Sequence, residues 1–283
     1  MKTLLKLDLF QWFFVIAITV SFLLMQNQFV WLKEFPKEFI FPLSAILNSG
    51  MEWVVDYSGW FFKGISWFLE WPIKGVRWLL HFLPWTVTVF LFFLVSYIAS
   101  GWGLVTFTLL ATFYMVLIGY WVESMNSFSL VAISVPMAVL VGFAIGSWGF
   151  FSERAEKVIN PTLDFLQTVP AFASLLPILL LFGFGTTVGL LASLIYSFPP
   201  MVRNTILGLR QVPSEIIESG IMSGASSKQL FWLVRVPTAW KQILLGVNQT
   251  TMASLSMVII ASILGGTADS GWEVLVYLRK AEF

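Results

Sequence analysis

A polar and basic segment, residues 211–237, stands between two long apolar blocks. The flanking runs 165–202 and 242–268 contain no Asp, Glu, Lys or Arg. Basic residues lie within and on both sides of the segment: Arg203, Arg210, Lys228, Arg235 and Lys241. Between membrane spans, such a basic loop is typical of the cytoplasmic side. The chain shows no constellation for covalent or acid–base catalysis. The residues that carry its pattern are Glu215, Glu218, Gly224, Ala225, Ser226, Val234, Val236 and Pro237.

The order of residues inside this segment predicts two short helices joined by a hinge. Pro213 suits the first turn of a helix, and Gly224 supplies the backbone freedom that a turn requires. Ser226 and Gln229 have the spacing of a capping box at the start of the second helix. Pro237 is expected to end that helix. The segment is therefore predicted to be a small folded platform.

The spacing within the segment resembles the cytoplasmic EAA loop of ABC-importer permease subunits. Glu218 is followed by Gly224 and, nine residues later, by Val-x-Val-Pro at 234–237. Ser219 and Gly220 replace the two alanines of that loop, and valines replace its Ile and Leu. The resemblance implies that Gly224 is the hinge and that Glu218 makes a polar contact anchoring the platform. The alternative for Glu218 is a solvated helix charge.

Three longer stretches, 160–185, 198–218 and 246–262, resemble the permeases of glycine betaine/proline/choline importers. The resemblance implies a type I ABC importer permease fold with a MetI-like transmembrane domain. It implies a homodimer of permease chains, a separate cytoplasmic ATPase that binds ATP and Mg, and an extracytoplasmic substrate-binding protein. Such permeases continue beyond the equivalent of residues 265–283 into one more span, so the resemblance implies that this chain lacks the last span.

Composition leads to the membrane class without any resemblance. Hydrophobic residues make up 58% of the 283 residues and charged residues 11%, compared with about 25% charged in soluble domains. A net charge of +1 gives no indication of nucleic-acid binding. With no cysteine and one histidine, no metal site is expected. No Gly-x4-Gly-Lys-Ser/Thr motif occurs, so we expect neither a bound cofactor nor ATP hydrolysis by this chain.

Charge-free runs predict an all-α polytopic protein with about seven transmembrane helices, at about 20 residues a crossing. The runs are 9–32, 78–122 (two spans, divided at 100–103), 124–152, 165–202 (two spans, divided at 183–185) and 242–268. A signal peptide at the first run is disfavoured, because the bulky, polar residues 25–28 do not form a cleavage site. The predicted divisions are 1–83, an N-terminal helix with an interfacial segment; 84–123, a two-helix hairpin; and 124–283, the core permease domain.

The positive-inside tendency predicts the orientation in a bacterial cytoplasmic membrane. With residues 203–241 inside, the segment 151–164 is also inside, and the short turn 121–127 lies outside. The N-terminus, with Lys2 and Lys6, is then cytoplasmic.

Residues 60–82 predict an amphipathic helix lying in the membrane interface. Charged and polar residues recur on one helical face, and aromatic residues fill the remainder. The face comprises Lys63, Glu70, Lys74, Arg77 and His81, and the aromatics include Trp67, Trp71 and Trp78. Pro72 is expected to bend or divide the helix, and His81 to be its wet end and not a ligand. The alternative is an aromatic cage for a quaternary ammonium ion, although interface anchoring is favoured.

Polar residues beside otherwise apolar spans are candidates for a translocation pathway, because unpaired polar groups in hydrocarbon are costly. They are Gln167, Thr168, Pro170, Asn248, Gln249 and Thr251. The alternative is that they join helices by hydrogen bonds, each worth about 1 kcal/mol. Gly142 and Gly146 have the spacing of a close helix–helix contact.

Two other transport classes remain as alternatives. A secondary transporter for a small zwitterion needs an ionisable relay within its spans and an internal repeat, and neither is found in the sequence. An osmotic channel predicts uptake without any ATPase. An ATP-driven permease needs only a pathway and a mechanical handle, which 218–237 supplies.

Overall fold

The structure is a computed structural model that describes residues 9–26, 29, 43–265 and 269–280. The described part is helical and contains no strand, which confirms the all-α prediction. The chain divides into two compact units, Met1–Val54 and Val55–Phe283. The first contains the apolar helix α1 (Leu9–Met25) within the predicted first span. Residues 27, 28 and 30–32 of that span, residues 33–42 and the lysines of the N-terminus lie outside the described residues.

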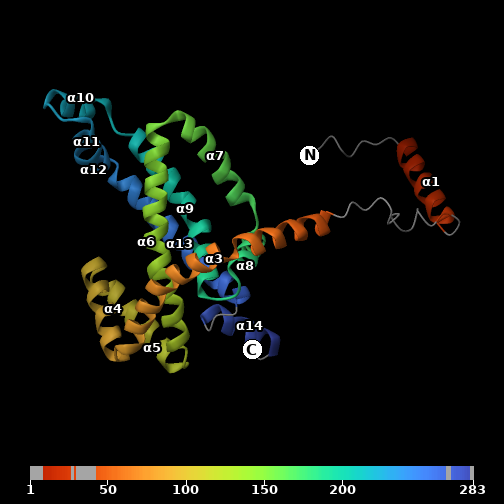
Figure 1. The fold of residues 1–283 in the computed structure, drawn as a ribbon, viewed down its shortest axis with the longest axis horizontal. Coiled ribbons are helices and arrows are strands. Elements are labelled where there is room, and N and C mark those ends of the chain that lie inside the picture. Colours follow the sequence, from red (N-terminus) through yellow and green to blue (C-terminus); the bar gives the residue numbers. More distant parts are fainter. Residues whose placement is uncertain (1–8, 27–28, 30–42, 266–268, 281–283) are drawn as a thin grey trace. The chain divides into compact units, whose positions relative to one another are not determined.

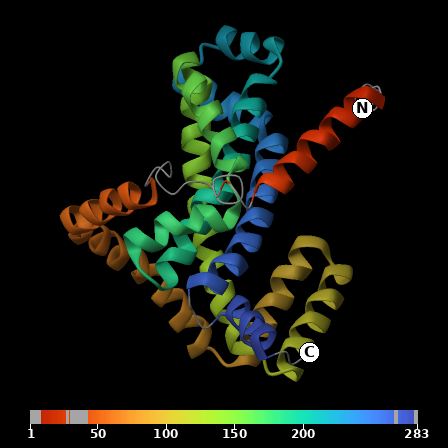
Figure 2. The same ribbon diagram turned by 90° about the vertical axis from the view of Figure 1, so that its right-hand side faces the viewer.

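The core of the second unit is a bundle of three long helices: α6 (Trp121–Phe151), α9 (Thr186–Arg210) and α13 (Trp240–Gly265). They run side by side in Figures 1 and 2, in yellow-green, teal and blue. The predicted contact of Gly142 and Gly146 is confirmed, because both face α9 at Met201 and Thr205. Small residues let helix backbones approach closely, as membrane helix pairs require.

The predicted division at 183–185 is confirmed, and its residues explain it. Helix α8 (Ala171–Phe182) ends at Gly183, and α9 begins after Gly185. Both glycines have positive φ, 75° and 143°, which side-chain-bearing residues rarely adopt. Before α8, helix α7 (Glu153–Thr168) ends at Val169–Pro170, and α8 departs from it at 101°.

A separate hairpin is formed by α4 (Trp85–Ser100) and α5 (Trp102–Leu117). The turn between them is Gly101, with φ +68°, inside the predicted break 100–103. Ser96 Oγ and Thr108 Oγ1 are hydrogen-bonded across the pair at 2.8 Å. Each helix spans roughly 24 Å at 1.5 Å a residue, short of the roughly 30 Å hydrocarbon layer.

Helix α3 (Leu43–Phe82) is longer than the amphipathic helix that was predicted, and Pro72 does not divide it. Leu69 and Ile73 are buried against Leu130, Leu190 and Val258 of the bundle. The aromatic side is exposed, as expected of an interfacial helix. At the C-terminal end of the charged face, Arg77 and His81 turn toward the bundle, where they meet Asp269 and Asn126.

Not every charge-free run forms one long helix. Among the described residues, α6 and α13 are each long and apolar enough to span a bilayer. Two bent pairs, α3 with α4 (107°) and α7 with α8 (101°), raise the number to four if each pair is one span. The predicted number was about seven. The difference arises because a charge-free run need not be a straight helix: Pro84, Gly101 and Pro170 lie at breaks within or beside these runs.

The bundle has two ends, which we name here. The loop end carries α10 (Ser214–Met222), α11 (Ser227–Gln229) and α12 (Val236–Thr238). The far end carries the α5–α6 turn at residues 118–120 and the last described helix, α14 (Ser270–Lys280). Figure 1 shows these ends at the top and bottom of the bundle. Helix α6 alone runs about 45 Å between them, from its 31 residues.

Candidate functional site: the platform at the loop end

The turn between the two predicted loop helices is where the sequence places it. Pro213 precedes α10, and Gly224 adopts φ +77° in the turn that follows the helix. Among the described residues, no atom lies within 4 Å of the Cβ that a substitution at Gly224 would add. The glycine is therefore required for its backbone conformation and not for space. The N–H of Ala225 closes the turn by donating to the Gly220 carbonyl at 3.1 Å.

The predicted capping box is confirmed. The backbone N–H of Gln229 donates to Ser226 Oγ at 3.4 Å, and Gln229 Oε1 accepts from the Ser226 N–H at 2.9 Å. These bonds satisfy two of the amide donors that a helix start leaves unpaired. They orient α11 as it leaves the Gly224 turn.

The prediction that Pro237 ends the second helix is wrong. After α11 the chain forms a π-helical turn, η2 (Leu230–Arg235), in which the N–H of Val236 donates to the Phe231 carbonyl. Pro237 then lies at the start of α12 and the chain remains helical. A proline has no N–H to donate, so it is tolerated in the first turn of a new helix. The π turn before it is a rare feature that occurs mostly as a single-turn bulge within α-helices, frequently at functional sites.

Packing holds the two parts of the platform together. Val234 is partly buried against α10, where a Cβ added at Gly220 would lie 3.4 Å from it and 2.8 Å from Leu230 Cδ1. Glycine in place of alanine at this point thus allows α10 to approach η2. Val236 packs on a buried cluster that includes Phe231 and Ala239.

Contacts with α6 and α7 anchor the platform to the bundle. The rings of Phe231 and Phe151 lie 4.9 Å apart, and Arg235 Cζ lies 5.1 Å from the centroid of Phe150. Immediately before the platform, Arg210 at the end of α9 forms an ion pair with Glu156 of α7. The segment is thus folded against the bundle, as predicted for a platform.

Helix α10 is the exposed part of this platform. Every one of its side chains is at least partly exposed, including Glu215 in its first turn and Glu218 in the middle. The apolar side chains of Ile216 and Ile221 are exposed, and that of Met222 is 89% exposed. An exposed apolar edge on a charged helix is typical of a surface that another protein covers.

The candidate pathway residues fall into two groups with different surroundings. Gln167 and Thr168 are exposed at the end of α7, where Thr168 donates to the Phe165 carbonyl, and Pro170 precedes α8. On α13, Asn248 is exposed and Thr251 donates to the Val247 carbonyl. The contacts of Thr168 and Thr251 stay within their own helices.

Gln249 alone among them joins two helices. Its Oε1 accepts from Asn204 Nδ2 at 2.9 Å, and Asn204 Oδ1 accepts from Gln242 Nε2 at 2.6 Å. This contact supports the helix-joining alternative at that residue. Asn204 and Gln242 were missed by sequence reasoning, because each lies beside the charges of the loop.

A second polar cluster was also missed. Ser254 Oγ lies 2.7 Å from Ser134 Oγ and 2.7 Å from Ser193 Oγ, so one hydroxyl links α13 to both α6 and α9. The three serines are fully buried. The signal that could have found Ser193 and Ser254 is the recurrence of small polar residues at spacings of four or eight: Thr250, Ser254 and Ser262 on α13, and Ser193 and Ser197 on α9.

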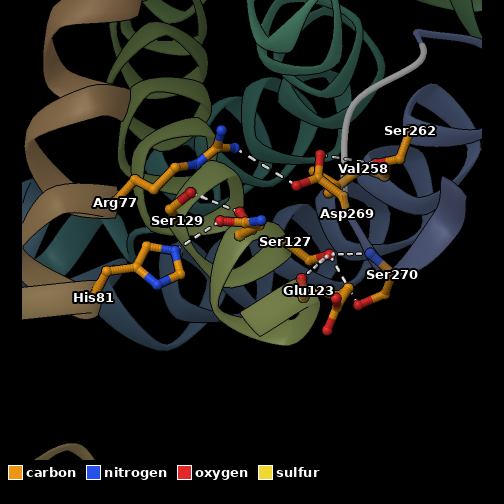
Figure 3. A network of polar contacts seen from close by, with 10 residues as sticks. Arg77, His81, Glu123, Ser127, Ser129, Val258, Ser262, Asp269 and Ser270 are labelled. Carbon is orange, nitrogen blue, oxygen red and sulfur yellow. Dashed lines mark hydrogen bonds and ion pairs between the residues drawn. The ribbon is translucent and has the colours of Figure 1, made fainter. Parts of the chain in front are cut away.

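Polar contacts also gather at the far end, as Figure 3 shows. Arg77 of α3 points toward the fully buried Asp269, with Nη2 and Oδ1 3.5 Å apart, and Ser262 donates to the same carboxylate. His81 Nε2 lies 2.9 Å from Asn126 Oδ1, so this exposed ring is attached to α6.

The link to α14 passes through Ser127, which donates to Ser270 Oγ and accepts from the Ser270 N–H. Together these contacts tie α3, α6 and α14 at the far end.

Comparison with known proteins agrees with this architecture. The family model described as "Binding-protein-dependent transport system inner membrane component" matches residues 134–276. The chain is 38% identical over 233 residues to the glycine betaine/proline betaine transport system permease protein of Escherichia coli, an alignment that covers 82% of this chain and 66% of that protein. It is 36% identical to the glycine betaine transport system permease protein of Bacillus subtilis, covering 79% of each. A trimethylamine N-oxide transport system permease protein of Pelagibacter ubique is 35% identical, with 84% of this chain and 32% of that protein covered. The chain therefore belongs to the family of binding-protein-dependent transport system inner membrane components.

Proposed function

We propose that this chain is the permease subunit of an ATP-driven importer of glycine betaine-type quaternary ammonium solutes. The observation that carries the coupling part is the exposed helix α10, which is anchored at its base by packing against the bundle. The relatives are named as permeases for glycine betaine, proline betaine and trimethylamine N-oxide. Each of these solutes carries a fully substituted, positively charged nitrogen.

In this proposal a separate ATPase receives α10 and the Gly224 turn on the cytoplasmic side. Glu218 makes a polar contact with that subunit, and Met222 fills an apolar recess of it. A second copy of this chain completes the translocation pathway, and a binding protein delivers the solute at the far end, which faces outward. ATP-driven closure of the ATPase pair moves the platforms together and rocks the helices as rigid bodies.

The bundle is suited to rigid-body motion. Helices α6 and α9 approach closely at Gly142 and Gly146, where the side chains of Met201 and Thr205 pack against the glycine backbone, and buried hydroxyls link both helices to α13. A force applied at the platform is therefore transmitted along packed helices and not absorbed by a slack loop.

The test is uptake of labelled glycine betaine into proteoliposomes that contain this chain. Three preparations are compared: the chain alone, the chain with its ATPase and binding protein but without ATP, and the full set with ATP. We expect accumulation only in the third. Uptake by the chain alone would instead identify a channel, and uptake driven by an imposed ion gradient would identify a secondary transporter.

A matched pair of variants tests the proposed contact between α10 and the ATPase. Met222→Asp places a charge on the apolar edge of α10 and is expected to abolish ATP-dependent uptake. The control is Lys228→Asp on α11, which also adds negative charge to the platform. A charge at Met252 would not serve as a control, because α13 is a span. Equal uptake by the wild type and Met222→Asp would contradict the proposed contact.

A further inference from the structure

A cavity of about 480 Å³ opens at the far end, between the α5–α6 turn and α14. Its wall contains the rings of Tyr114, Tyr120 and Tyr277, together with the carboxylate of Glu273. This volume lies within the range of about 300–1,000 Å³ that is typical of small-molecule sites. The cavity is thus large enough for a small solute and combines aromatic faces with one negative charge.

The geometry around Tyr277 shows that its ring face accepts a cation. Tyr120 and Tyr277 meet edge to face, with centroids 6.4 Å apart and planes at 71°. The Nζ of Lys280 lies 5.8 Å from the centroid of Tyr277. One cation of the chain itself therefore already lies against this ring, as the attraction of a positive charge to an aromatic face predicts.

The electrostatics of the cavity favour positive charge. Glu273 lies in the cavity wall. Glu123 lies in the first turn of α6, and its buried Oε2 has no hydrogen-bond partner among the described residues. The hydrogen bond with Tyr277, burial, and the negative charges of Tyr277, Glu273 and Glu123 together raise the pKa of Tyr120 to about 12. Glu273 and Glu123 are thus close enough to Tyr120 to act on it electrostatically.

We propose that this cavity is a binding site, on the permease itself, for the quaternary ammonium end of a small zwitterionic solute; the proposal rests on the proposed function. A quaternary nitrogen has no N–H to donate, so hydrogen bonds cannot hold it. Aromatic faces and a nearby carboxylate hold such a group through electrostatic attraction. The pair of Tyr277 and Glu273 on one helix, with Tyr120 opposite, supplies both.

The position of the cavity gives the site a role in the proposed import cycle. It lies at the end of the bundle opposite the platform, where the binding protein is proposed to release its solute. The walls belong to α14, to the end of α5 and to the start of α6, and Ser270 of the cavity wall is hydrogen-bonded to Ser127 of α6. A solute in the cavity therefore contacts a helix that runs through to the loop end.

The experiment measures binding of glycine betaine and tetramethylammonium to the full chain in lipid nanodiscs by saturation-transfer NMR. The charge control is 3,3-dimethylbutanoate, in which carbon replaces the nitrogen of glycine betaine at nearly unchanged shape. We expect glycine betaine and tetramethylammonium to bind and 3,3-dimethylbutanoate to bind at least about tenfold more weakly. Equal binding of glycine betaine and 3,3-dimethylbutanoate would overturn the proposal, because the cavity would then select shape without charge.

Variants locate the site. Tyr277→Leu and Glu273→Gln are each expected to weaken tetramethylammonium binding by at least about threefold, whereas Tyr277→Phe retains the ring and the affinity. The matched control is Tyr97→Leu on α4, since Tyr97 is 47% exposed, Tyr277 is 41% exposed, and Tyr97 lies outside the cavity wall. Binding unchanged in both Tyr277→Leu and Glu273→Gln would overturn the proposal.

The two proposals fail in different ways. If the assembled importer takes up glycine betaine while Tyr277→Leu and Glu273→Gln leave binding to the chain alone unchanged, the cavity proposal is overturned and the function stands. If the importer does not take up any quaternary ammonium solute, the proposed function is overturned. The binding measurements then still decide whether the cavity holds tetramethylammonium, because they require neither ATP nor a partner.

Discussion

Substitution of Gly146 by alanine tests whether α6 and α9 make the close approach on which the bundle depends. A Cβ at this position would lie 2.6 Å from Thr205 Cβ and 2.9 Å from the Val202 carbonyl oxygen. A change of rotamer moves neither atom, because one is bonded directly to the backbone and the other belongs to it. The two helices must therefore separate to admit one methyl group.

The magnitude follows from two opposing terms. Overpacking of a closely packed contact costs about 1–3 kcal/mol, and the upper part of that range applies because backbone must move. Replacing glycine by alanine within a helix returns about 1 kcal/mol. We therefore expect Gly146→Ala to lower the free energy of unfolding by about 1–2 kcal/mol.

Gly75→Ala on α3 is the matched control, since among the described residues no atom lies within 4 Å of its added Cβ. It is expected to keep the helix-propensity gain alone, about 1 kcal/mol of stabilisation. The two variants then differ by about 2–3 kcal/mol, which is the packing cost.

Denaturation of the full chain in mixed micelles, followed by circular dichroism, measures both variants under one condition. Equal stability of Gly146→Ala and Gly75→Ala would refute the close approach of α6 to α9, and with it the rigid coupling of platform to bundle.

Three further predictions concern the platform and the far end. Gly224→Val should reduce substrate-stimulated ATP hydrolysis by the assembled importer far more than Gly224→Asn, since a β-branched residue at φ +77° costs at least about 1–2 kcal/mol and asparagine tolerates this conformation; equal activities would contradict the hinge. Asp269→Asn should lower the free energy of unfolding by about 3 kcal/mol by leaving Arg77 without its buried counter-charge, and the double variant with Arg77→Leu should recover part of the loss in the same denaturation assay. In an ultraviolet titration, Tyr120 should remain mostly protonated at pH 11, where an ordinary tyrosine is about 90% ionised. Because its folded pKa of about 12 exceeds the unfolded value of about 10, its contribution to stability is complete below pH 10 and is lost as pH rises through 12, and Tyr120→Phe should abolish this dependence.

The parts of the site that could be predicted from sequence are those whose physics is local. The turn at Gly224 and the capping box of Ser226 with Gln229 depend on backbone preference and on bonds between residues three apart. Helix breaks at Gly101 and at 183–185 follow for the same reason. Pro237 shows the limit of such reasoning, since the same residue ends one helix or begins the next, according to the register of the preceding turn.

Sequence alone thus determined the all-α membrane class, the folded segment 211–237 and its turn at Gly224, because hydrophobicity, charge and turn chemistry are properties of neighbouring residues. Tertiary structure alone decided which helix faces meet. Ser134 finds Ser254, and Arg77 finds Asp269, across separations far longer than any helix period. The cavity between Tyr120, Tyr277 and Glu273 likewise forms only where helices that are distant in sequence pack together. A helical period assigns residues to a face, but packing of whole helices selects the face that each one contacts.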